Sequence, residues 1–90
     1  MTLSPVQTTR FRRDIRQMGR SGKNIELLEA IVRKLARGEP LPPRNRDHNL
    51  GGNWKGYREC HITPDWLLIY KVDGRDLVLV RTGSHSDLFG

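Results

Sequence analysis

Apolar residues recur with helical spacing in two segments near the start of the chain. Phe11, Ile15 and Met18 follow one another at intervals of four and three residues, after a pair of threonines that can cap a helix. A second stripe is longer, and it consists of Ile25, Leu28, Ile31, Val32 and Leu35. Gly38 ends this segment. The first 38 residues therefore predict two amphipathic helices, preceded by a short strand over 3–7.

The second half of the chain has the patterns of β-strands. Residues 54–62 alternate, which places Glu59 and His61 on one face and Cys60 on the other. Residues 66–72 are apolar on both faces, as in a covered central strand, and residues 77–82 form a third strand. Turn sequences join the three, so we expect an antiparallel meander. Its other expected member is the segment 3–7, whose proline implies an edge strand or the start of a strand.

These elements predict an α+β fold, in which two N-terminal helices pack on a twisted antiparallel sheet of about four strands. The 90 residues are enough for one domain with a single modest core, so we expect residues 1–90 to form one domain. Residues 38–53 contain three prolines and little periodicity. A connection of this length is uncommon unless it has a function.

Positive charge is concentrated in the helical half. The net charge is +6, and residues 1–38 carry nine Lys or Arg against three acids, whereas residues 39–90 carry seven of each. Such an imbalance favours a polyanionic partner, with the helices gripping phosphate. We therefore expect Arg12, Arg13 and Arg16 to contact the phosphates of a nucleic acid, as candidate RNA-binding residues. The alternative is a solvated basic helix face that has no partner.

The cysteine content and the hydropathy of the chain indicate its cellular compartment. Cys60 is the only cysteine, which excludes an internal disulfide and favours a reducing cytoplasm. Its apolar setting indicates a buried thiol rather than a nucleophile. No stretch approaches the ~20 apolar residues of a membrane span, and the start of the chain does not have the pattern of a signal peptide. We expect a cytoplasmic protein that does not contact a membrane.

The predicted meander brings distant polar residues to one edge of the sheet. The end of the first strand, the turn after it and the end of the third strand meet there, so His61, Asp65, Arg81 and His85 should lie close together. The long loop brings His48 within reach. These residue types suit RNA cleavage by its own 2′-hydroxyl, which needs a base, an acid and a cation for the phosphorane charge. The reaction requires no metal or cofactor.

Other uses of these residues remain open. A zinc site is one, although the histidines at 48, 61 and 85 have no paired-ligand spacing. Asp65 and Glu59 can equally be structural, as a turn carboxylate and a cross-strand charge partner. A non-catalytic RNA- or DNA-binding module would explain the basic helices. It makes no demand for three histidines at one sheet edge.

Residue identity and spacing are distinctive in three segments of the second half. They are Asp47-His48-x-Leu50-x-Gly52-x-Trp54-x-Gly56-Tyr57-Arg58, His61-x-x-x-Asp65-Trp66-x-Leu68-Ile69-Tyr70-Lys71 and Arg81-Thr82-Gly83-Ser84-His85-x-x-Leu88-Phe89-Gly90. The three segments closely resemble the YafQ-type toxins of the RelE superfamily, over residues 47–90. Residues 8–38 match that family only as a pair of helices.

The resemblance implies a RelE-like fold, cleavage of mRNA in the ribosomal A site, and inhibition by a cognate, DNA-binding antitoxin. The catalytic set that it implies is His48, His61, Asp65 and His85, with Arg81 as the contact to phosphate or to the transition state. Phe89 would position the mRNA, or else cover an open end of the core, and Lys55 is a further candidate RNA contact. Glu59 stands where the family has an aspartate, which leaves its role open.

Overall fold

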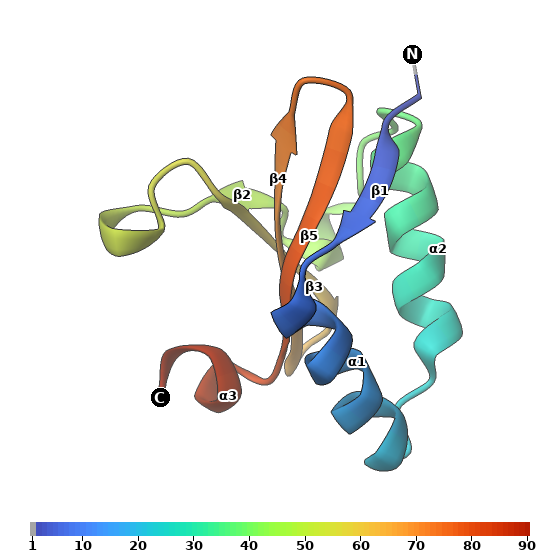
Figure 1. Ribbon diagram of the computed structural model, residues 1–90, viewed down its shortest axis with the longest axis vertical. Helices are drawn as coiled ribbons and strands as arrows, with labels where there is room; N and C mark the ends of the chain where they lie inside the picture. Colours follow the sequence, from blue (N-terminus) through green and yellow to red (C-terminus); the bar gives the residue numbers. More distant parts are fainter. Residues whose placement is uncertain (1) are drawn as a thin grey trace.

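The computed structural model describes residues 2–90, so only Met1 of the expected domain lies outside it. Two helices lie on one side of a five-stranded sheet, and a short third helix lies on the other side (Figure 1). The strands are β1 (Ser4–Gln7), β2 (His48–Asn49), β3 (Arg58–Thr63), β4 (Trp66–Asp73) and β5 (Asp76–Gly83). The helices are α1 (Thr9–Arg20), α2 (Ile25–Ala36) and α3 (His85–Phe89). No helix within residues 2–90 is both long and apolar enough to cross a membrane.

The two predicted helices are confirmed, together with the faces that they bury. Thr8 caps α1, because its hydroxyl accepts the backbone N–H of Phe11 at 3.0 Å. Asn24 caps α2 in the same way through the N–H of Glu26. The apolar stripes face the sheet, with Phe11 and Met18 buried on α1. The arginines of α1 lie on its exposed side.

The sheet has the order β1-β5-β4-β3-β2, and the predicted meander of β3, β4 and β5 is confirmed. The predicted α+β fold is confirmed, and its sheet differs in two respects from the expected antiparallel sheet of about four strands. β1 is an edge strand as expected, but it runs parallel to β5. Residues 8–57 separate it from the meander, so no tight turn dictates its direction. β2 is a fifth strand of two residues, which is too short to show any alternation.

The strand predicted over 54–62 begins only at Arg58. Gly52 and Gly56 have φ angles of 59° and 94°, in the left-handed region that glycine tolerates, and a 3-10 turn ends at Trp54 between them. The rings of Trp54 and Tyr57 therefore contact each other edge-on at 5.4 Å, on the same face as Ile69. A regular strand would have placed these two rings on opposite faces.

Core residues lie on both faces of the sheet, rather than in the single core that we expected. The larger cluster fills the space between the sheet and helices α1 and α2, and includes Leu68 and Tyr70. The smaller cluster joins Leu67 and Ile69 to Leu88 of α3. Because successive side chains of β4 pack into opposite clusters, this strand has to be apolar on both faces.

Cys60 is fully buried in the larger cluster, as predicted. Burial raises the pKa of its thiol to about 12, with smaller contributions from nearby carboxylates. The side chain is therefore a neutral thiol at cellular pH, and it packs as a small apolar residue.

Candidate active site

Two of the predicted site histidines meet at one buried carboxylate. His48 is the cross-strand partner of Glu59, and its Nε2 lies 3.5 Å from Glu59 Oε1. His61 Nε2 lies 3.8 Å from the same oxygen. The Glu59 side chain is 8% exposed, whereas that of His48 is 48% exposed. A buried carboxylate thus faces both imidazoles, of which His48 is open to solvent and His61 is mostly covered.

The other ring nitrogen of each histidine faces a backbone carbonyl. His48 Nδ1 lies 2.5 Å from the carbonyl oxygen of Arg46, and His61 Nδ1 lies 3.3 Å from that of Pro64. Both carbonyl oxygens are acceptors, so each favours the tautomer of its ring that carries a hydrogen on Nδ1. The other nitrogen of each ring, Nε2, is the one that lies beside Glu59.

The long loop before β3 is held in place by partly buried polar contacts. The side-chain amide of Asn45 donates to the carbonyl oxygen of His61 at 2.7 Å. Asp47 accepts the hydroxyl of Tyr70 and pairs with Arg58, at 3.2 Å between Nη2 and Oδ1. Burial, followed by the bond to Asp47, raises the pKa of the Tyr70 hydroxyl well above its ordinary value, so that it stays a donor. These contacts fix the approach of the loop to β3.

A cavity of about 280 Å³ opens beside His61. Arg44, Arg46 and Pro64 form the rest of its lining. Both arginine side chains are exposed, and this part of the long loop therefore adds two cations to the surroundings of the histidine pair.

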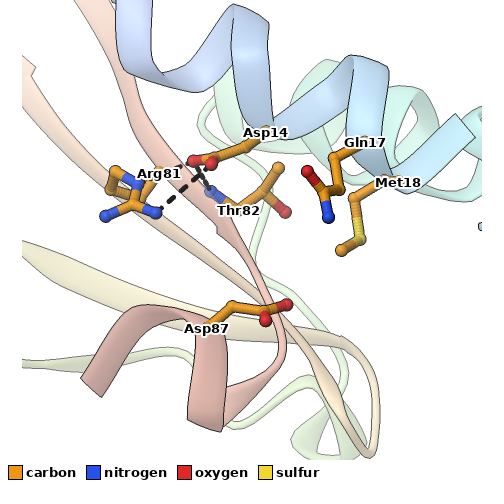
Figure 2. A pocket seen from close by; sticks show the side chains of 6 residues that line it. All are labelled: Asp14, Gln17, Met18, Arg81, Thr82 and Asp87. Carbon is orange, nitrogen blue, oxygen red and sulfur yellow. Dashed lines mark hydrogen bonds and ion pairs between the residues drawn. The ribbon is translucent and has the colours of Figure 1, made fainter. Parts of the chain in front are cut away.

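Arg81 lies across the sheet from this pair, but its side chain meets a different partner. Glu59 and Arg81 both pair with Ile69 of β4, from opposite sides, so their backbones are separated by roughly 10 Å, two strand spacings. The Arg81 guanidinium binds Asp14 of α1, at 2.7 Å between Nε and Oδ2 (Figure 2). The expected direct grouping of Arg81 with the histidines is not what the structure shows.

His85 begins α3, an element that we did not predict because five residues are too few to show a period. Ser84 and Asp87 form a reciprocal capping box at its start. The bonds from Ser84 lower the pKa of Asp87, which keeps it an acceptor. The His85 ring is exposed, with its centroid 5.1 Å from that of Phe89.

Phe89 connects α3 to the loop before β3, since its ring lies 6.1 Å from that of Trp54. Leu88, next to it, packs on the face of the sheet that carries Leu67 and Ile69. Glu59 and His61 point to that same face, because Cys60 between them points to the other. His85 is therefore on the face of the histidine pair, although no contact joins it to either ring.

The remaining predicted residues are exposed. Asp65 lies in the turn between β3 and β4, and within residues 2–90 its carboxylate makes no hydrogen bond or ion pair. Arg12, Arg13 and Arg16 lie on the outer side of α1, and Lys55 follows the 3-10 turn. Their exposure suits contact with RNA, and it equally suits a solvated surface.

Sequence reasoning missed the central position of Glu59 and the partner of Arg81. Glu59 alternates with its neighbours on a half-buried strand, and this pattern gives no sign of a buried carboxylate. Asp14 had a weak signal, because it is the only acid of a helix that holds five arginines. No group of three His, Cys, Asp or Glu side chains in the described part of the chain is arranged to hold a metal ion.

Comparisons with known proteins agree with the resemblance seen in the sequence. The family model described as the bacterial toxin YafQ of a type II toxin–antitoxin system matches residues 3–90. The mRNA interferase toxin YafQ of Escherichia coli K12 is 40% identical over 81 residues, covering 89% of this chain and 88% of its own.

Two solved structures share the fold over nearly the whole chain. A copper-bound mutant toxin from Helicobacter pylori is 40% identical and superposes with a TM-score of 0.93, covering 97% of this chain and 99% of its own. The toxin of the E. coli DinJ–YafQ toxin–antitoxin complex is 35% identical, with a TM-score of 0.90 and full coverage of both chains. The chain belongs to the YafQ family of bacterial type II toxins.

Proposed function

We propose that this protein is a ribosome-dependent endoribonuclease, which cleaves mRNA in the ribosomal A site and so inhibits translation. Its family membership and the mRNA interferase name of the E. coli relative support RNA cleavage. The observation that carries the proposal is the pair His48 and His61 around the buried Glu59, on the sheet face that also bears His85. A binding module has no use for titratable rings held in this way.

The chemistry is an internal displacement at phosphorus. One imidazole accepts the proton of the 2′-hydroxyl, whose oxygen attacks the adjacent phosphorus and forms a cyclic phosphate. The bond to the 5′-oxygen breaks, and a second imidazole protonates this leaving oxygen. His48, His61 and His85 supply the base and the acid, Glu59 orients the first two, and Asp65 completes the catalytic set. Arg81 stabilises the negative charge of the phosphorane.

The exposed cations and one aromatic ring hold the RNA. Arg12, Arg13 and Arg16 contact phosphates from α1, and Lys55 does so from the loop before β3. Phe89 offers its ring for stacking on a base, beside His85. These contacts position the strand, and the ribosome presents the scissile bond.

A neutralising antitoxin is the expected partner, since one relative of the same fold is the toxin of a toxin–antitoxin complex. We propose that residues 1–90 act as a single domain in the cytoplasm. The Helicobacter relative is copper-bound. In the present chain, Glu59 and the backbone carbonyls already face the nitrogens of His48 and His61, and no metal-holding group lies within residues 2–90.

Induction of the gene in bacteria tests the proposal. We expect growth arrest and cleavage of mRNA within its codons. Both effects should be relieved by His85→Ala and by co-expression of the antitoxin. Purified toxin should cleave mRNA on programmed ribosomes. If His85→Ala remains fully toxic and RNA stays intact, the protein is a non-catalytic RNA- or DNA-binding module instead.

A further inference from the structure

The single acid of α1 points inward, away from the arginines around it. The Asp14 side chain is 14% exposed, and its carboxylate accepts three hydrogen bonds from β5 (Figure 2). Arg81 donates two of them, from Nε to Oδ2 at 2.7 Å and from Nη2 to Oδ1 at 3.2 Å. The backbone N–H of Thr82 donates the third, to Oδ2 at 3.1 Å. One side chain thus binds two consecutive residues of the strand.

The carboxylate occupies the edge of β5 just beyond the end of β1. The last residue pair between these strands is Gln7 with Leu79, so Thr82 has no strand beside it on that side. Asp14 satisfies its N–H instead. The Thr82 hydroxyl accepts from Trp66 Nε1 at 2.9 Å and donates to the carbonyl oxygen of Leu67 at 2.7 Å. The backbone next to Arg81 is therefore fixed from both sides.

The bonds to Asp14 leave one side of the guanidinium free. They use Nε and one hydrogen of Nη2, whereas Nη1 points away from the carboxylate (Figure 2). The Arg81 side chain is only 17% exposed, so it has little room to adopt another orientation. A guanidinium whose Nε edge is bound in this way still offers donors to a phosphate oxygen.

We propose that Asp14 is a positioning residue for cleavage: it orients Arg81 so that the free donors of the guanidinium face the scissile phosphate. The inference rests on the proposed function, in which Arg81 contacts that phosphate. It also links the basic helix α1, expected to lie on RNA, to the strand end that carries the catalytic face. Three residues beyond Thr82, the chain starts α3 with His85.

The first experiment detects the contact between Asp14 and Arg81 directly and does not depend on cleavage activity. In the nitrogen-15 spectrum of the full-length protein, the Nε–H signal of Arg81 is assigned by its loss in Arg81→Ala. We expect a signal protected from exchange in the wild type, which shifts and exchanges faster in Asp14→Asn, because the amide removes the charge and sets an NH₂ group against Nη2. Asparagine keeps an oxygen for the Thr82 N–H, so the backbone signals should persist. An Arg81 Nε–H signal unchanged in Asp14→Asn would overturn the proposal.

The second experiment measures single-turnover cleavage on programmed ribosomes at saturating toxin. We expect Asp14→Asn to slow cleavage by about tenfold or more, because a displaced cation stabilises the phosphorane less well. Ribosome binding and the thermal midpoint should stay close to those of the wild type. Asp73→Asn is the matched control, since it removes the same charge at the exposed opposite end of the β4–β5 hairpin. It should cleave at the wild-type rate.

A double-mutant cycle separates positioning from mere bracing of the fold. If Asp14 acts through Arg81, then Asp14→Asn should slow the Arg81→Ala protein no further. Additive losses, or a wild-type rate in Asp14→Asn, would overturn the proposal. Arg81→Lys covers the case of a poorly folded Asp14→Asn, because lysine keeps the charge but cannot make the paired bonds. We expect it to be slow as well, and a wild-type rate again contradicts positioning.

Failure of the underlying function has a different pattern. If Arg81→Ala and His85→Ala both cleave like the wild type, the proposed site is wrong. The proposal that Asp14 positions Arg81 for cleavage is then refuted as well. If both are slow while Asp14→Asn is fast, the site stands and only the role of Asp14 is refuted.

Discussion

The carboxylate of Glu59 lies opposite His48 across the β2–β3 pair, with 3.5 Å between Oε1 and Nε2. Its other oxygen, Oε2, is buried and has no hydrogen-bond partner within residues 2–90. A buried carboxylate with an unpaired oxygen costs stability, since desolvation is only partly offset. A residue kept at such a cost is expected to serve the site rather than the fold.

We therefore predict that Glu59→Gln separates stability from activity. The amide preserves the shape and removes a buried charge, so the thermal midpoint should stay the same or rise by a few degrees. Cleavage should fall by at least about tenfold, because no carboxylate remains to orient the two Nε2 atoms. Calorimetry and single-turnover rates on one preparation test this, with the exposed Glu39→Gln as the control. A loss of stability with full activity would make Glu59 structural.

A second prediction concerns the arginines of α1. Replacing Arg12, Arg13 and Arg16 by Gln should weaken ribosome association whatever codon occupies the A site, and should reduce its salt dependence, because fewer counterions are released. Sedimentation with ribosomes at several salt concentrations measures the slope. The matched control is the triple replacement of Arg33, Lys34 and Arg37 on α2, which removes the same charge. Equal slopes for the two triple variants would mean that net charge matters, rather than the surface of α1.

The sequence allowed the prediction of those elements whose own side chains determine them. Strand β4 is an example. Leu67, Leu68 and Ile69 place apolar side chains on both faces of the sheet, whatever packs against the strand. The direction of β1 was not accessible, since it depends on a crossover of about fifty residues. Helix α3 and strand β2 are too short for any periodicity to register.

The candidate site was predictable only in part, for a related reason. The meander placed His61 at one edge of the sheet with the long loop, and so His48, within reach, but the β2 register that sets His48 opposite Glu59 was not predicted. The partner of Arg81 depends instead on how α1 is rotated against the β5 edge. An aspartate among arginines, such as Asp14, has the pattern of a solvated helix face, and only the packed structure shows that it turns inward.

A third prediction is that chelator does not abolish cleavage. No group of three His, Cys, Asp or Glu side chains in the described residues is arranged to hold a metal ion, and the Nδ1 atom of each ring in the histidine pair faces a backbone carbonyl. Toxin treated with EDTA, freed of chelator and added to ribosomes with their magnesium should cleave as fast as untreated toxin. Recovery of activity only after zinc or copper is added would contradict the metal-free chemistry.

A fourth prediction follows from the raised pKa of Cys60, about 12. Because the thiol stays neutral in the folded state, it should react slowly with disulfide reagents at pH 8 and rapidly once urea unfolds the chain. The unfolded thiol has a pKa of about 8.5, so only the unfolded state loses this proton as the pH first rises above that value. The contribution of Cys60 to stability is thus full below pH ~8.5 and declines toward pH 12. Wild type and Cys60→Ala, compared by urea unfolding, should converge in stability over this range.

The last prediction concerns His85, the exposed first residue of α3. The helix is capped by Ser84 and Asp87, and Leu88 anchors it, so the imidazole contributes to folding only through its contact with Phe89. His85→Ala should therefore shift the thermal midpoint by no more than a few degrees and leave ribosome and antitoxin binding intact. As a positioned acid or base, however, an imidazole supplies about 10²–10⁴-fold in rate. We expect single-turnover cleavage of A-site mRNA to fall by at least about a hundredfold at saturating toxin.

The matched control is Ser86→Ala, the next exposed residue of the same helix, which should cleave like the wild type. Parallel binding measurements decide between two roles for the ring. If rate falls while binding holds, His85 takes part in proton transfer. If binding falls in step with rate, His85 positions the RNA together with Phe89, and His48 and His61 must supply both acid and base. A rate within severalfold of the wild type would remove His85 from the site altogether.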